Sequence, residues 1–204
     1  MEPIQDYITA LQRTMDQLGQ QSIADAIRVL QHARLRGNQV FIMGNGGSAS
    51  TASHFVCDLA KNTRREGQLH FRVMGLTDNM AIFSAYANDE GYENVFSQQL
   101  ENLINPGDLV VAISASGNSK NVLNAIAEAQ KHQATTIGFT GFDGGRLGQM
   151  VDINIHVKSN IIEHVEDIHL MLEHMIVKII KDQPQASVNI ATSIAPLVAN
   201  VRVD

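Results

Sequence analysis

Two segments of the sequence carry side chains that can transfer protons or bind a metal. In the first, His54 and Asp58 lie four residues apart in a stretch, residues 50–60, that is predicted to be helical, so both side chains share one face of the helix. An imidazole and a carboxylate spaced in this way can form half of a metal site. They can equally form a local pair on a solvated face, and the two residues alone do not separate these interpretations.

The second segment, residues 162–180, has Ile, Leu and Met at helical spacing on one face and ionisable residues on another. A charged helical face is usually solvated, and His169 with Glu173 can be a simple i, i+4 pair. A catalytic or metal-binding role therefore stays one alternative beside a solvated face. The acidic residues and histidines of this segment are Glu163, His164, Glu166, Asp167, His169, Glu173 and His174.

Two glycine- and serine-rich turns are candidates for binding a phosphate. We call GNGGSAS, residues 44–50, the glycine loop, and SASGNS, residues 114–119, the serine loop. Each follows a short apolar run and opens a predicted helix, whose first N–H groups can bind an anion without a cationic side chain. Such turns are also common without a ligand. Neither has the GxxxxGK[ST] pattern of a P-loop, and no GxGxxG precedes a ribose-binding acid, so a nucleotide cofactor is disfavoured.

The elements that must position these loops follow from the hydrophobic pattern. Apolar runs at 39–43, 69–76, 109–114, 135–140 and 153–157 suit strands buried on both faces. Helical patterns at 50–60, 80–87, 95–103, 122–132 and 146–150 alternate with them, which predicts a parallel sheet in a three-layer α/β sandwich. Two further helical segments, 4–18 and 22–36, come first and are predicted to form an antiparallel pair.

Length and composition limit the classes of protein. A chain of 204 residues with 44% hydrophobic residues predicts one domain, 1–182, made of N-terminal helices (1–36) and an α/β core (37–182), with a tail at 183–204 of unassigned role. A net charge of −6 disfavours nucleic acid and acidic membranes as partners. Without an apolar signal core or a membrane-length apolar stretch, we expect a cytoplasmic location. Cys57 is the only cysteine, which excludes an internal disulfide, and we expect it to be buried.

Three motifs together resemble the sugar isomerase (SIS) domain family. They are GNGGSA (44–49), AISASGNSKNV (112–122) and ANDEGYENVFSQQLE (87–101), and the last is similar to the phosphoheptose isomerase subfamily. The resemblance covers residues 1–182. It implies a five-stranded parallel sheet of flavodoxin-like type and a homotetramer with active sites between subunits. It also implies aldose–ketose isomerisation of a sugar phosphate, such as sedoheptulose 7-phosphate, through an enediol.

The resemblance also assigns residues. The sugar phosphate would be lined by Asn45, Gly46, Gly47, Ser48, Asn88, Asp89, Ser114, Ala115, Ser116, Ser119 and Glu166.

For the metal, the family's zinc ligands, a His and a Glu on one helix and a Gln and a His on the last, correspond to His54, Asp58, Glu166 and His174. Asp58 and Glu166 depart from the family's Glu and Gln but keep an oxygen ligand, so Zn²⁺ is expected with its identity open. By position, Asp58 is the base and His174 the acid.

Two alternatives keep the fold and change the function. One is a non-catalytic sugar-phosphate sensor or adaptor, similar to relatives that bind the replication initiator DnaA. Such a protein does not need ionisable side chains at positions 54, 58, 166 and 174, and this chain has them at all four. The other alternative is regulatory binding of an amino-sugar phosphate.

Overall fold

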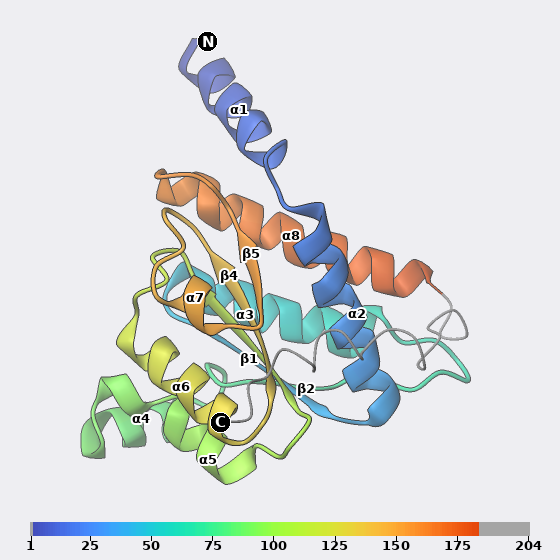
Figure 1. Ribbon diagram of the computed structural model, residues 1–204, viewed down its shortest axis with the longest axis vertical. Coiled ribbons are helices and arrows are strands. Elements are labelled where there is room, and N and C mark those ends of the chain that lie inside the picture. Colours follow the sequence, from blue (N-terminus) through green and yellow to red (C-terminus); the bar gives the residue numbers. More distant parts are fainter. Residues whose placement is uncertain (1, 184–204) are drawn as a thin grey trace.

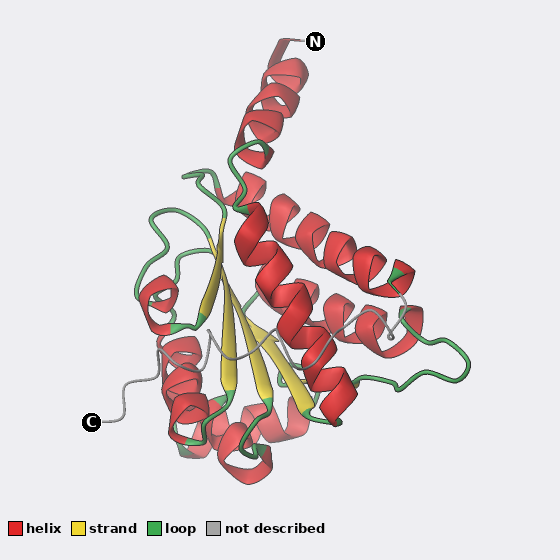
Figure 2. Ribbon diagram, turned by 45° about the vertical axis from the view of Figure 1, so that its right-hand side comes forward, coloured by secondary structure: helices red, strands yellow, loops and turns green. Residues whose placement is uncertain are grey.

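The computed structural model describes residues 2–183, in which a five-stranded parallel sheet lies between two layers of helices (Figures 1 and 2). The strands are β1 (Gln39–Gly44), β2 (Arg72–Gly75), β3 (Leu109–Ser114), β4 (Thr135–Thr140) and β5 (Ile153–His156). Their order, β2-β1-β3-β4-β5, is the flavodoxin-like order, so the predicted fold class is confirmed.

Strand residues alternate between two cores because successive side chains point to opposite faces of a sheet. In β1, Val40 and Ile42 join the core on one face, whereas Phe41 and Met43 join the core on the other. The first core is covered by α2 (Gln20–Arg36), α3 (Gly47–Cys57) and α8 (Ile162–Asp182). The second lies against α5 (Ser97–Leu103), α6 (Lys120–Lys131) and α7 (Leu147–Met150).

The edge strand β2 is shorter and more exposed than the sequence predicts. The apolar run 69–76 forms a strand only over Arg72–Gly75, and of its four residues only Gly75 is buried. β2 pairs with β1 on one side and ends the sheet on the other, so burial on both faces is wrong for this strand.

The two N-terminal helices are present but do not form the predicted antiparallel pair. α1 (Glu2–Met15) extends away from the body and runs in nearly the same direction as α2, as both ribbon views show (Figures 1 and 2). α1 is held at the start of α8, where the Tyr7 hydroxyl donates to the Asp167 carboxylate (2.6 Å). The local helical pattern predicted both helices, but the turn between them leaves α1 projecting outward.

Two helices that matter for the site follow the strands directly. α3 begins at Gly47, after β1, and continues into a π-helical turn at Asp58–Asn62. α4 (Met80–Asp89) follows β2 and is capped by Asn79, whose side-chain oxygen accepts from the Ile82 N–H.

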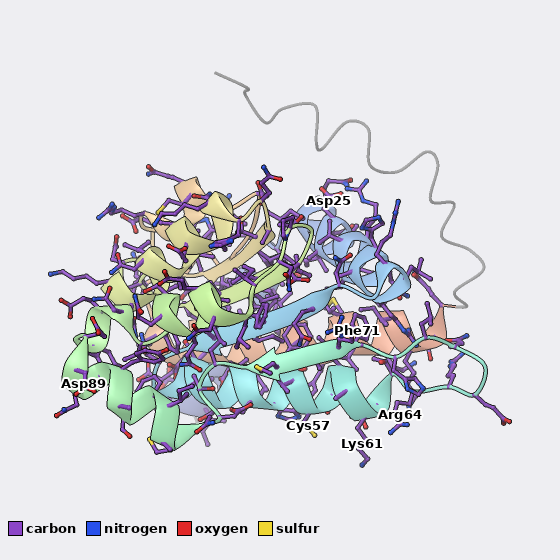
Figure 3. The ribbon with its side chains drawn as sticks, turned by 90° about the horizontal axis from the view of Figure 1, so that it is seen from below. Asp25, Cys57, Lys61, Arg64, Phe71 and Asp89 are labelled. Carbon is purple, nitrogen blue, oxygen red and sulfur yellow. The ribbon has the colours of Figure 1, made fainter. Side chains whose placement is uncertain are left out.

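Cys57 is exposed, so its predicted burial is wrong, and Figure 3 shows it pointing outward from the helix.

Within residues 2–183 no helix has the length and hydrophobicity that a membrane span requires. Residues 184–204, which hold most of the predicted tail, lie outside the described part of the chain.

Candidate active site

The glycine loop and the serine loop lie side by side at the carboxyl edge of the sheet. They follow β1 and β3, which are neighbouring strands, and the helices that leave them, α3 and α6, pack on opposite faces. The two loops therefore lie at the switch point of the strand order, where parallel α/β proteins bind ligands. The structure thus brings together the two predicted phosphate-binding turns.

The serine loop is held in one shape by its neighbours. Gly117 has φ +62°, and a Cβ there would lie 2.2 Å from the Gly144 carbonyl oxygen. The Gly117 carbonyl accepts from the Leu147 N–H (2.9 Å), and the Asn118 side-chain oxygen accepts from the Arg146 N–H (3.2 Å). These contacts leave the hydroxyls of Ser114 and Ser119 close together, 3.4 Å apart, at the start of α6.

A pair of amides joins the glycine loop to the serine-loop helix. Asn45 donates to the Asn121 side-chain oxygen and accepts from the Asn121 amide, each at 2.9 Å, and the Tyr92 hydroxyl also donates to the Asn45 oxygen (2.9 Å). Asn45 was predicted to line the sugar phosphate, and its side chain here links the two loops. Asn121, which is buried, and Tyr92 were not predicted, because a helix-start Asn has an ordinary capping explanation.

Glu166 and the start of α3 meet at the glycine loop. A Cβ on Gly47 would lie 2.5 Å from a carboxylate oxygen of Glu166, so the acid occupies the space that a side chain would need. Gly46 has φ +55°, and Ser48 is buried in the first turn of α3. Glu166 therefore lies with the predicted sugar-phosphate residues.

Asn88 and Asp89 are the last two residues of α4. They are exposed at the end of α4, and the Asn88 amide donates to the Asp89 carboxylate (2.6 Å). Figure 3 shows Asp89 at the outer edge of the molecule.

Four ionisable side chains converge between α3 and α8, and we call His54, Asp58, Glu173 and His174 the ionisable cluster. Their ligand-capable atoms all lie within 4.8 Å of one another. The two imidazole Nε2 atoms are 3.3 Å apart, and a Glu173 oxygen lies 3.2 Å from the His174 ring and 3.6 Å from the His54 ring. Such a set of two imidazoles and two carboxylates can hold a divalent metal.

The fourth member of the ionisable cluster differs from the predicted ligand set. His54, Asp58 and His174 are brought together as predicted, but Glu173 takes the place expected for Glu166. From the sequence alone, Glu173 can be a simple i, i+4 partner of His169. Instead, the His169 ring contacts the Thr140 carbonyl (3.3 Å) on the sheet side of α8.

Glu173 is the most deeply buried member of the ionisable cluster. Its side chain is 0% exposed, against 44% for His54 and 49% for His174. Burial, together with the charge of Asp58, raises the pKa of Glu173 to about 8. An acid in this environment keeps its proton at neutral pH unless a cation or a charged imidazole compensates.

A local distortion of the helix lies at Asp58. Here the helix changes to a π-helical turn, and the Asn62 amide donates to the Asp58 carboxylate (2.6 Å). Single π-helical turns occur often at functional sites. The Asn62 contact fixes the orientation of the carboxylate toward the imidazoles, as outer partners of metal ligands and catalytic acids do.

Known proteins are similar to this chain over most of its length. A family model described as SIS domain matches residues 5–141. The chain belongs to the SIS-domain family. A phosphoheptose isomerase of Aliarcobacter butzleri is 38% identical over 80% of this chain and 86% of its own length. A probable phosphoheptose isomerase of Thermoplasma acidophilum is 41% identical over 72% of this chain and 80% of its own.

Solved structures place this SIS-domain chain in the phosphoheptose isomerase subfamily as well. The phosphoheptose isomerase from Francisella tularensis superposes with a TM-score of 0.82 at 30% identity, covering 89% of this chain and 98% of that one. The phosphoheptose isomerase GmhA from Neisseria gonorrhoeae gives a TM-score of 0.81 at 26% identity with the same coverage. The SIS resemblance is therefore confirmed at the level of both family and subfamily.

Proposed function

We propose that this protein is an isomerase that interconverts the aldose and ketose forms of a sugar phosphate, with sedoheptulose 7-phosphate as the first candidate. The observation that carries the proposal is one continuous arrangement along α3. The glycine loop opens the helix, with the serine loop beside it at the edge of the sheet, and the ionisable cluster lies two turns further along α3. The subfamily relatives are named as phosphoheptose isomerases, which supports a catalytic role over a DnaA-binding adaptor.

The phosphate would bind at the serine loop. The Ser114 and Ser119 hydroxyls and the first N–H groups of α6 can surround a dianion without a cationic side chain. The glycine loop, with Gly46, Gly47 and Ser48, would cover the opposite side, and Glu166 would face the sugar hydroxyls. Ala115 and Ser116 complete the turn.

The proton transfers would be made by Asp58 and His174. Isomerisation needs a base that removes the proton from the carbon next to the carbonyl, and an acid that moves a proton between the enediol oxygens. Asp58 is oriented by Asn62, and the exposed edge of His174 can reach a bound sugar. Asp58 is therefore assigned as the base and His174 as the acid.

The donor set fits a divalent metal such as Zn²⁺. His54, Asp58 and His174 would supply three ligands and a carboxylate of α8 the fourth. When bound, the metal would supply positive charge that stabilises the developing enediolate oxygen.

The assembly would be a homotetramer with sites between subunits. None of the ten residues of α4, all of them described, is buried, although the helix is rich in apolar side chains. Exposed Met80, Ile82 and Tyr92 make this region suited to contact with another copy. Asn88 and Asp89 lie on the same helix, so such a contact would carry them to a neighbouring site. The cytoplasmic location and the lack of a nucleic-acid partner stay predictions from composition.

An assay of ketose phosphates tests the proposal. With sedoheptulose 7-phosphate, we expect Asp58→Asn and His174→Asn to lower kcat by about 10²- to 10⁴-fold, because each removes one proton-transfer group. Asp16→Asn and His70→Asn, at exposed positions away from the ionisable cluster, are the matched controls and should keep the wild-type rate. Wild-type turnover by both site variants would overturn the assignment. Inactivity on every ketose phosphate, with sugar-phosphate binding retained, would favour the sensor.

A further inference from the structure

Glu173 is buried without a hydrogen bond to its carboxylate from any described residue, and two imidazole rings that could pair with it when protonated lie 3.2 Å and 3.6 Å away. Its side chain is fully buried, and neither of its oxygens has a hydrogen-bond partner within residues 2–183. Burying a polar group without a hydrogen bond is costly, and burying an unpaired charge costs more. A cation between the four side chains would remove this cost.

Three of the four donor atoms, those of His54, Glu173 and His174, are spaced as in a tetrahedral metal site. Zinc binds imidazole nitrogen and carboxylate oxygen at about 2.0–2.1 Å, so neighbouring ligand atoms of a tetrahedron lie about 3.3–3.4 Å apart. The His54 and His174 nitrogens are 3.3 Å apart, and the Glu173 oxygen lies 3.2 Å and 3.6 Å from them. Asp58 is slightly further out, with an oxygen 3.8 Å from His54.

Glu166 lies beside a different part of α3 from Glu173. It precedes Glu173 by seven residues, which corresponds to about 10 Å along an α-helix axis. α3 and α8 run in parallel, so Glu166 faces Gly47 at the start of α3, whereas Glu173 and His174 face His54 (Figure 1). The two carboxylates thus lie beside different turns of α3.

We propose that Glu173, and not Glu166, is the fourth ligand of a divalent transition metal bound by His54, Asp58 and His174. Glu166 is then free to contact the sugar. The role of this metal in turnover rests on the proposed function, but binding of the metal does not, because it can be measured without a substrate. The change of ligand moves the negative charge deeper between α3 and α8 and leaves the more exposed imidazoles beside the substrate.

Metal titration of the full chain, first stripped of metal with a chelator, tests the proposal. We expect one Zn²⁺ per chain in the wild type and a dissociation constant at least about 100-fold larger in Glu173→Leu, since even indirect partners of metal ligands change affinity by about 10- to 100-fold. The matched control is Glu166→Leu, the same substitution on the same helix, which should stay within about threefold of wild type. Co²⁺ should give a tetrahedral absorption spectrum in the wild type and Glu166→Leu, and not in Glu173→Leu.

Thermal unfolding with and without Zn²⁺ separates a lost ligand from a lost fold. Without metal, Glu173→Leu should unfold no earlier than the wild type, because it removes an uncompensated buried acid. Zn²⁺ should raise the Tm of the wild type and Glu166→Leu and leave that of Glu173→Leu unchanged. If Glu173→Leu does not fold, Glu173→Gln, which keeps the size and loses the charge, should still bind Zn²⁺ more weakly than Glu166→Gln.

Two results would overturn the ligand assignment: wild-type Zn²⁺ affinity in Glu173→Leu, or loss of Zn²⁺ binding in Glu166→Leu alone. Failure of the proposed function has a different signature. An inactive protein that still binds Zn²⁺ through Glu173 would refute the isomerase and leave the ligand assignment intact. An active isomerase that binds Zn²⁺ equally well without Glu173 would refute the ligand assignment and leave the isomerase intact.

Discussion

His169 is a buried imidazole on α8 that the reaction does not use. It is 1% exposed, and its ring lies edge-on to Phe139 with the centroids 5.8 Å apart. Burial lowers the pKa of His169 to about 4, and the contact with the Thr140 carbonyl opposes this shift only in part. The folded protein therefore holds this ring neutral at a pH where the unfolded chain protonates it.

Acid should destabilise the protein through this residue. Between pH 6.5 and 4 the unfolded state binds more protons at His169 than the folded state, so the free energy of unfolding falls as the pH falls. The variant His169→Gln keeps a hydrogen-bond donor and does not titrate. Between pH 6.5 and 4 we expect its free energy of unfolding to fall by up to about 3 kcal/mol less than that of the wild type. Urea unfolding at several pH values measures the difference. The control, His70→Gln at an exposed position, should show the same pH dependence of the free energy of unfolding as the wild type. If the free energy of unfolding of His169→Gln also falls as steeply as that of the wild type, the prediction is contradicted.

At the scale of elements, the site depends on how one loop is fitted against another. The serine loop rests on residues 144–147, and the Asn45–Asn121 pair joins it to the glycine loop. These contacts tie both loops to each other at the ends of β1 and β3. Substitutions at this junction should act on sugar-phosphate binding more than on proton transfer.

Gly117→Ala tests the fit of the serine loop. The new Cβ would clash with the Gly144 carbonyl at 2.2 Å, and neither backbone segment can move without opening the loop. We expect KM for the sugar phosphate to rise at least about tenfold and stability to fall by roughly 1–3 kcal/mol.

Gly37→Ala is the control for this substitution. Gly37 has a similar φ, +70°, but open space around the new Cβ, so it carries only the strain of the left-handed backbone. It should lose some stability and leave KM unchanged. Equal KM values in the two variants would show that the close approach at Gly117 does not matter for binding.

At the scale of the whole molecule, several large apolar side chains are exposed to solvent and do not belong to either core. Ile4 and Ile8 are exposed on α1, which projects from the body, and Met80 and Ile82 are exposed on α4. Both helices are amphipathic or apolar, and the sheet does not cover these faces. Contact with other copies of the chain would bury them.

Ile82→Glu should break the proposed homotetramer. A charge at the centre of an apolar contact must be desolvated without a partner, so the assembly should shift to smaller species at micromolar concentration. Size-exclusion chromatography with light scattering measures the mass. Arg64→Glu, at an exposed site on the loop after the π-helical turn, changes the charge as a control and should leave the mass unchanged. A wild type that elutes as a monomer would refute the homotetramer.

Local patterns in the sequence were enough to predict most of the fold. The runs at 109–114 and 135–140 match β3 and β4 residue for residue, because a strand buried on both faces is built from apolar, β-branched and small residues without charges. The glycine and serine loops were found for a similar reason, since a turn that brings backbone N–H groups to a ligand needs glycine at fixed places. These features depend on a few neighbouring residues and on little else.

Packing between elements that are distant in the sequence decided the features that local patterns did not predict. The direction of α1, the Asn45–Asn121 pair and the choice of Glu173 over Glu166 all depend on which faces meet across the fold. On α8 both acids occur in a charged stretch, and their order along the chain does not show which one faces His54. That depends on the parallel packing of α3 and α8, which sets one acid against the glycine loop and buries the other between two imidazoles.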